Sequence, residues 1–242
     1  MAITTRDVPY SDGDVALHGV LAWDDAAGAP LPGILLVHGG AGLDDHAREQ
    51  ARRYAALGHT VFACDMFGDG VIGDRERMIA RLVGMRDDPT RLVQRARAGV
   101  AALVACPEAD GCLAAVGFCF GGLTVITLAR FGTDIAGVIS MHGALATKAP
   151  AQPGAVRAKI LACHGASDPH VPWSDVVAFS DEMTNASANW QLIAYGGAVH
   201  GFTHRNAVPG ATPGVEYHEA TDRRSFAAAQ AFLEELPGAR RG

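Results

Sequence analysis

The hexapeptide Gly-Phe-Cys-Phe-Gly-Gly at residues 117–122 combines a potential nucleophile with the small residues that a tight turn needs. It follows a short apolar segment, Leu113–Val116, typical of a buried strand, and precedes an apolar helical segment, Leu123–Phe131. A strand, a sharp turn and a helix form the nucleophile elbow G-x-S-x-G, here with Cys119 in place of serine. Because a helix N-terminus favours negative charge, we expect Cys119 to ionise readily and to act as a nucleophile.

Burial in the core is the alternative for any free cysteine, since the thiol packs like a small apolar group. Cys64 and Cys163 end apolar segments that we predict to be strands, and Cys106 and Cys112 flank a loop. Among the five cysteines, Cys119 is set apart by the glycines at elbow spacing around it. We therefore predict a chemical role for Cys119 and packing roles for the other four.

A thiol nucleophile needs a base, and the base needs a carboxylate that orients it. After an elbow of this kind the chain order is nucleophile, acid, histidine. Asp168 follows the predicted strand Ile160–Cys163, and His200 follows the predicted strand Trp190–Tyr195. Taken singly, an aspartate before proline is often a turn former, and a lone histidine is often structural. Together, and in this order, they predict a Cys119–His200–Asp168 triad.

An acyl-transfer site also needs backbone N–H groups that stabilise an oxyanion. We predict the N–H of Phe120, directly after the nucleophile, as one donor. The second is predicted in the loop His38–Gly42, which follows the apolar segment Gly33–Val37, with Gly40 as the donor. An ordinary glycine-rich turn is the alternative, whereas a phosphate-binding loop is excluded because no Gly-Lys-Ser/Thr follows.

The segments between these motifs predict how the motifs are positioned. Further apolar segments typical of strands occur at 15–22, 60–64 and 135–141, and helical patterns occur at about 44–57, 88–104, 174–183 and 218–236. Alternation of strands and helices predicts an α/β fold, with a mostly parallel, doubly wound sheet, helices on both faces and one domain over residues 1–242. The arginine-rich stretch within residues 68–88 is predicted as an insertion that forms a lid; a solvated helix face is the alternative.

Composition limits the classes of partner. The chain has 242 residues, 49% of them hydrophobic, and a formal net charge of −6 without a basic block, which argues against nucleic acid and membrane partners. The cysteines lack C-x-x-C spacing, and the first ten residues are polar, so we expect a reduced, cytoplasmic protein. His200 and His204 have i, i+4 spacing, but without a third ligand we expect no metal, and no motif indicates a cofactor. A monomer and a homodimer are both compatible with the sequence.

With these motifs in view, the sequence resembles the dienelactone hydrolase family of α/β-hydrolases from about Leu31 to Leu236. Three motifs carry the resemblance: Gly-Phe-Cys-Phe-Gly-Gly at 117–122, His-Gly-Ala-Ser-Asp-Pro-His-Val-Pro at 164–172 and Val-His-Gly-Phe at 199–202. The resemblance implies an α/β-hydrolase fold and a triad of Cys119, His200 and Asp168 that opens an ester or lactone through an acyl-enzyme, as in a carboxymethylenebutenolidase.

The resemblance also implies two arginines that hold a carboxylate on the substrate. Arg205, beside the histidine loop, is the candidate for one of them. Arg81, Arg77 or Arg75, in the arginine-rich stretch, could supply the other, and His142 is expected to line the site. The family's glutamate in the loop after the first buried parallel strand is absent, because residues 38–40 read His-Gly-Gly. The expected partner is thus a small ester or lactone substrate, which can be neutral or anionic. A general carboxylesterase or thioesterase and a non-catalytic ligand-binding or redox-sensing protein remain the alternatives.

Overall fold

The computed structural model describes residues 2–28, 30–68, 70–208 and 210–237. The other residues of the predicted domain 1–242, including residue 69 of the predicted lid segment, lie outside the described residues. The strands are β1 Ile3–Asp12, β2 Val15–Asp24, β3 Leu31–Val37, β4 Thr60–Cys64, β5 Ala109–Phe118, β6 Gly137–Met141, β7 Lys159–Gly165 and β8 Trp190–Tyr195. The helices are α1 Asp45–Ala55, α2 Arg75–Asp87, α3 Pro89–Val104, α4 Phe120–Arg130, α5 Trp173–Asn185 and α6 Glu219–Glu234, with a short 3-10 helix at Asp25–Ala27.

The strands form one sheet in the order β1-β2-β4-β3-β5-β6-β7-β8. From β4 to β8 every neighbouring pair is parallel, whereas β2 runs antiparallel to β4 and to β1. Strands β3, β4 and β6 are buried along their whole length, as expected of parallel strands covered on both faces. The predicted mostly parallel, doubly wound sheet in a single domain is confirmed.

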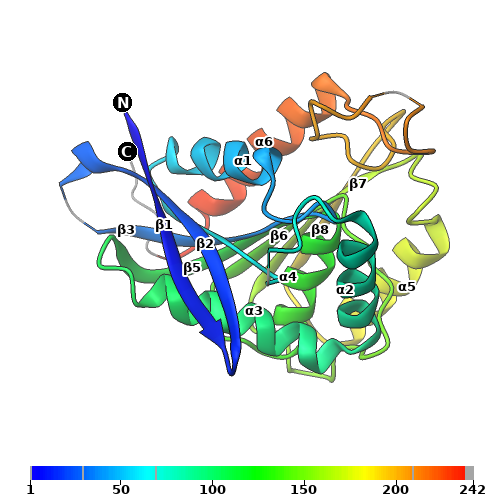
Figure 1. The fold of residues 1–242 in the computed structure, drawn as a ribbon. Helices are drawn as coiled ribbons and strands as arrows, with labels where there is room; N and C mark the ends of the chain where they lie inside the picture. Colours follow the sequence, from blue (N-terminus) through cyan, green and yellow to red (C-terminus); the bar gives the residue numbers. More distant parts are fainter. Residues whose placement is uncertain (1, 29, 69, 209, 238–242) are drawn as a thin grey trace.

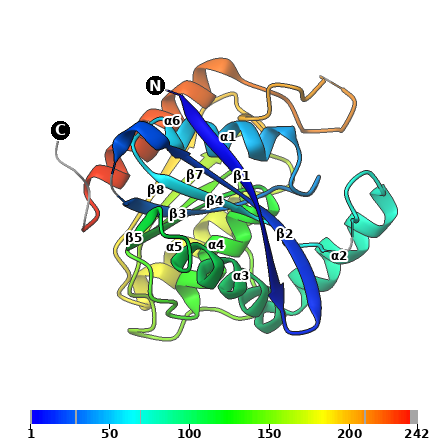
Figure 2. The same ribbon diagram turned by 60° about the vertical axis from the view of Figure 1, so that its left-hand side comes forward.

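Helices cover both faces of the sheet. Helices α1 and α6 lie on one face, and α3, α4 and α5 lie on the other (Figures 1 and 2). Each face has its own buried cluster: Tyr54 of α1 and Phe232 of α6 belong to one, and Ile126 of α4 and Phe179 of α5 belong to the other. Helix α2 stands outside both layers, where Figure 2 shows it projecting from the body of the protein. It occupies the predicted lid segment.

Strand β1 is absent from the sequence-based expectation. All its residues are half-buried or exposed, because it is an edge strand that pairs only with β2. A polar edge strand has few apolar side chains, so its pattern resembles that of a loop. Strand β5 is also longer than predicted, since it starts at Ala109 instead of Leu113.

Three aspartates set where α-helices begin. The side chains of Asp44 and Asp88 accept the backbone N–H groups of Ala47 and Arg91 and so cap α1 and α3. Asp74 caps α2 in the same way. The position of α2 therefore follows from a local signal, although its orientation does not.

Candidate active site

The turn between β5 and α4 places Cys119 at the carboxyl edge of the sheet. Cys119 has φ 54° and ψ −112°, a conformation that L-residues rarely adopt. A Cβ atom at Gly117 would lie 2.0 Å from the carbonyl oxygen of Gly121, and one at Gly121 would lie 2.1 Å from that of Val37. Only glycine fits at both positions, so the hexapeptide folds as an elbow that puts the sulfur at the N-terminus of α4.

The loops after β7 and β8 bring Asp168 to His200. The Nδ1 atom of His200 lies 2.8 Å from Oδ2 of Asp168, and the other oxygen of Asp168 accepts the backbone N–H of His170 at 2.8 Å. Burial acts to raise the pKa of Asp168, but the contacts with His200 and His170 outweigh it and lower that pKa below its usual value. The carboxylate is therefore ionised and holds Nδ1–H of His200.

Cys119 and His200 have opposed pKa shifts. Burial acts to raise the pKa of the Cys119 thiol, yet its hydrogen bond to His200 and the charge of that ring lower it. Burial acts to lower the pKa of His200, yet contacts with Asp168 and Cys119 raise it to about 10. Each group stabilises the charged form of the other, so the arrangement favours a thiolate beside an imidazolium.

The backbone N–H groups of Gly40 and Phe120 also point to the sulfur of Cys119, and both lower its pKa. They come from different segments, the loop after β3 and the first residue of α4. The structure thus places both N–H groups predicted from the sequence beside Cys119.

A pocket of about 500 Å³ opens over Cys119 and His200. One wall is apolar and comes from α2, whose Met78, Ile79 and Leu82 line it. This wall is the part of the predicted lid segment that contacts the site. The pocket is large enough for a small acyl compound with an aromatic or alkyl group.

The polar lining of the pocket carries little net charge. Besides the Cys119–His200 pair, Asp44 and Arg75 are its charged residues, and His46, His142 and His204 contribute imidazole rings. Burial lowers the pKa of His46 to about 4, and burial also lowers the pKa of His142 well below its usual value. Both rings are therefore neutral at physiological pH.

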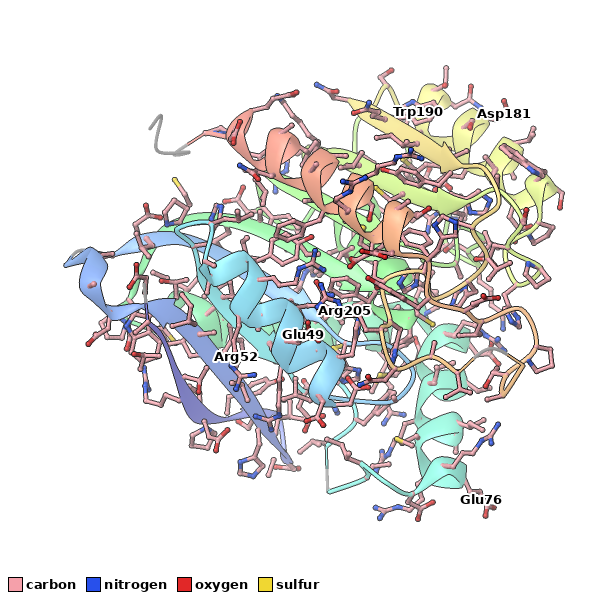
Figure 3. All side chains as sticks on the ribbon, turned by 90° about the horizontal axis from the view of Figure 1, so that it is seen from above. Glu49, Arg52, Glu76, Asp181, Trp190 and Arg205 are labelled. Carbon is pink, nitrogen blue, oxygen red and sulfur yellow. The ribbon has the colours of Figure 1, made fainter. Side chains whose placement is uncertain are left out.

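The predicted substrate-binding residues are only partly brought together. His142 lines the pocket. Arg81 lines a separate hollow on the other side of α2, together with Arg77. Arg205 lies over α1, where its side chain pairs with Glu49 at 3.2 Å (Figure 3).

The arginine that faces the pocket is Arg75, and helical geometry explains why. Residues 75, 78, 79 and 82 have the i, i+3, i+4, i+7 spacing of one helix face. Residues 77 and 81 lie on the opposite face. The periodicity of α2 was thus the signal in the sequence that separates Arg75 from Arg81.

The sequence did not predict that buried hydrogen bonds link His142 and His46, which both line the pocket, through Thr203. Thr203 Oγ1 lies 2.9 Å from Nε2 of His142 and 3.2 Å from Nε2 of His46. The amide nitrogen of Gln50 approaches the same His46 nitrogen at 3.4 Å, so this nitrogen accepts and the Thr203 hydroxyl donates to it. The oxygen of Thr203 then accepts Nε2–H of His142. The ring of His142 packs edge-on against the ring of His200, with 5.3 Å between the ring centroids.

Within the described residues, no group of three or more His, Cys, Asp or Glu side chains is arranged to hold a metal ion. Of the helices that the structure describes, none has the length and apolar character needed to cross a membrane.

A mostly parallel sheet of this order, with a strand–turn–helix elbow at Cys119 and with Asp168 and His200 in the loops after β7 and β8, is the architecture of an α/β-hydrolase. The family model described as "Dienelactone hydrolase family" matches residues 17–236, and the chain belongs to that family.

Two solved structures resemble nearly the whole chain. The crystal structure of a dienelactone hydrolase-like promiscuous phosphotriesterase from metagenomic libraries is 36% identical, with a TM-score of 0.92 over 98% of this chain and 99% of that one. A protein named m3DLH is 38% identical, with a TM-score of 0.91 over 98% of this chain and 99% of that one. An uncharacterised protein of Caenorhabditis elegans is 36% identical over 149 residues, which are 60% of this chain and 94% of that protein. The chain is therefore a hydrolase of the dienelactone hydrolase family.

Proposed function

We propose that this hydrolase cleaves carboxylic esters and lactones, with Cys119 as the nucleophile. The observation that carries the proposal is the pairing of Cys119 with His200 beneath the N–H groups of Gly40 and Phe120, at the floor of a pocket. Asp168 supports the proposal because it holds Nδ1–H of His200 and so directs Nε2 toward the sulfur.

Acylation begins when the thiolate of Cys119 attacks the carbonyl carbon and a C–S bond forms. The electron pair of the C=O bond moves to the oxygen, which accepts hydrogen bonds from the N–H groups of Gly40 and Phe120. When the carbonyl reforms, the C–O bond to the leaving group breaks. The imidazolium of His200 gives its Nε2 proton to the departing oxygen and becomes neutral.

Deacylation reverses these roles. Neutral His200 takes a proton from water as the water oxygen attacks the acyl carbon, and the same N–H groups hold the oxyanion. The C–S bond then breaks, which releases the carboxylic acid and restores the thiolate of Cys119. In a lactone the leaving oxygen stays attached to the acyl group, so hydrolysis gives a single product that carries both the new hydroxyl group and the new carboxylic acid.

The lining of the pocket favours an uncharged substrate. Met78, Ile79 and Leu82 present apolar surface, and Asp44 offsets the charge of Arg75. A substrate carboxylate would find one arginine in this lining, without the second that the family resemblance implies. An aryl or alkyl ester, or a neutral lactone, is therefore the substrate class that we propose.

A panel of aryl esters, neutral and anionic lactones and acyl thioesters tests this function. We expect multiple turnovers on the aryl esters, with an initial burst of phenolate equal to the enzyme concentration, and loss of both in Cys119→Ala. Release of at most one equivalent of product would instead support a redox-sensing or ligand-binding protein on the same fold. A preference for thioesters over both other classes would support a thioesterase.

Phosphotriester hydrolysis is a second candidate, because a structure with 36% identity and a TM-score of 0.92 belongs to a dienelactone hydrolase-like promiscuous phosphotriesterase. Attack of Cys119 on phosphorus would form an S–P bond and release an aryloxide that takes the proton of His200. Water would then have to cleave the S–P bond. Turnover of an aryl dialkyl phosphate by wild type and its loss in Cys119→Ala would establish this activity; a single equivalent of aryloxide would exclude it.

A further inference from the structure

His38, at the end of β3, is fully buried and does not line the pocket. Its Nδ1 atom lies 2.7 Å from the carbonyl oxygen of Gly39, and its Nε2 atom lies 3.1 Å from the backbone nitrogen of Met66. Because a backbone N–H can only donate, Nε2 must accept from Met66. The proton of the neutral ring is then on Nδ1, which donates to the Gly39 carbonyl. One tautomer satisfies both contacts.

The Gly39 carbonyl also accepts the backbone N–H of Gly42 at 3.2 Å. Two donors therefore fix the direction of this carbonyl. The carbonyl of Gly39 and the N–H of Gly40 belong to the same planar trans peptide, in which the two groups point in opposite directions. Whatever fixes the Gly39 carbonyl therefore also fixes the N–H of Gly40.

We infer that His38 is a positioning residue, which aims the N–H of Gly40 at the oxyanion by holding the carbonyl of Gly39. The inference rests on the proposed function, in which this N–H is an oxyanion donor. A peptide between two glycines rotates easily because no Cβ restricts it. The hydrogen bond from His38 to the Gly39 carbonyl acts as a clamp on this peptide. Without it, the N–H of Gly40 would spend part of its time turned away from Cys119.

The surroundings of His38 keep the clamp rigid. The ring of Phe67 packs edge-on against His38, with 4.8 Å between ring centroids. Met66, which donates to His38, is itself held through its carbonyl by the buried guanidinium of Arg95 at 2.9 Å, and Arg95 pairs with Asp12 at 2.8 Å. Burial lowers the pKa of His38, so the ring stays neutral near pH 7 and keeps this tautomer.

Two substitutions separate the two hydrogen bonds of His38. In His38→Gln, the amide can reach the position of Nε2 and accept from Met66, but the Gly39 carbonyl loses its side-chain donor and keeps only the backbone N–H of Gly42. In His38→Asn, the shorter amide places an N–H near the position of Nδ1 and retains that donor. The matched control is His59→Gln, which removes a partly buried imidazole near Leu57 and Leu236, away from the pocket over Cys119.

Two readouts follow the N–H of Gly40. The first is the apparent pKa of Cys119, measured from the pH dependence of alkylation by iodoacetamide. This N–H stabilises the thiolate, so we expect the pKa to rise by about 0.5–1 unit in His38→Gln. The second is hydrolysis of an aryl ester, where we expect kcat to fall by about 10- to 100-fold with KM within about threefold. In His38→Asn, the pKa of Cys119 and kcat should both lie close to their wild-type values. His59→Gln should match wild type in both.

The inference is overturned if His38→Gln keeps the wild-type pKa of Cys119 and the wild-type kcat, or if His38→Asn loses as much as His38→Gln. Should near-ultraviolet circular dichroism show that His38→Gln is unfolded, His38→Asn decides alone: kcat within about fivefold of wild type supports the inference, and a larger loss overturns it. If wild type hydrolyses no ester, the proposed function fails, while the alkylation comparison still tests the clamp.

Discussion

Replacing Asp168 with asparagine tests whether this carboxylate supports the protonated form of His200. The backbone N–H of His170 donates to one oxygen of Asp168, so that position must remain an acceptor in the variant. The amide nitrogen of the asparagine then faces Nδ1 of His200, which lies 2.8 Å from Asp168 Oδ2 in the wild-type structure. Two N–H groups cannot donate to each other, so His200 must lose its Nδ1 proton and become neutral.

The magnitude follows from the shift in the pKa of His200. Burial acts to lower this pKa, but Asp168 and Cys119 raise it from 6.5 to about 10. A rise of that size corresponds to about 5 kcal/mol. If Asp168 supplies about half, its loss costs roughly 2–3 kcal/mol, which is about 30- to 150-fold in rate when the imidazolium protonates the leaving group.

The assay is stopped-flow hydrolysis of an aryl ester across the pH range. In Asp168→Asn we expect kcat to fall by at least about 30-fold, and the alkaline limb of kcat/KM, set by His200, to move below pH 10. Asp175→Asn, in the first turn of α5, is the matched control and should leave kcat unchanged. A nearly silent Asp168→Asn together with a crippled Asp175→Asn would show that the acid is misassigned.

Four further outcomes are expected. Cys119→Ala should lower turnover by at least about 10³-fold without changing the far-ultraviolet spectrum. In the wild type, iodoacetamide should label Cys119 before the fully buried Cys64, as judged by peptide mass spectrometry; equal labelling would contradict a low thiol pKa. Arg75→Ala should raise KM for an anionic lactone by up to about fivefold and spare a neutral ester, whereas Arg205→Ala should change neither; equal effects on both substrates would exclude anion recognition by Arg75. Burial and the nearby His204 lower the pKa of His46 to about 4, so below pH 6.5 the unfolded chain binds a proton that the folded chain does not. Between pH 6.5 and 4.5 the free energy of unfolding, measured with urea, should therefore fall by about 2–3 kcal/mol, and by less in His46→Gln; a flat profile would refute the reasoning.

Much of the candidate site could be predicted from the sequence, because its signals are local. An elbow needs glycine where strand and helix backbones cross, and Gly117 and Gly121 stand at those two positions within a single hexapeptide. The positions of Cys119, Asp168 and His200 after predicted parallel strands also predict that the three residues meet. The carboxyl ends of parallel strands lie at one edge of the sheet, whatever side chains the strands carry.

Other features depended on which faces of distant elements meet. The sequence marks an arginine-rich helix, but only the packing of α2 over the elbow puts Arg75 at the pocket and Arg81 outside it. The pairing of Arg205 with Glu49 is likewise a contact between segments more than 150 residues apart.

The chain His46–Thr203–His142 and the clamp of His38 show the same limit. In the sequence, His38 and His142 directly follow apolar segments, whereas His46 and Thr203 lie next to polar residues. No local pattern indicates the hydrogen-bond partner of any of the four. A buried polar group must find a hydrogen-bond partner, but which one is decided only when the fold brings the donors and acceptors together. The composition and order of the chain thus determine the fold and the order in which Cys119, Asp168 and His200 follow one another, while the tertiary structure decides hydrogen-bond partners, tautomers and the charge of the pocket.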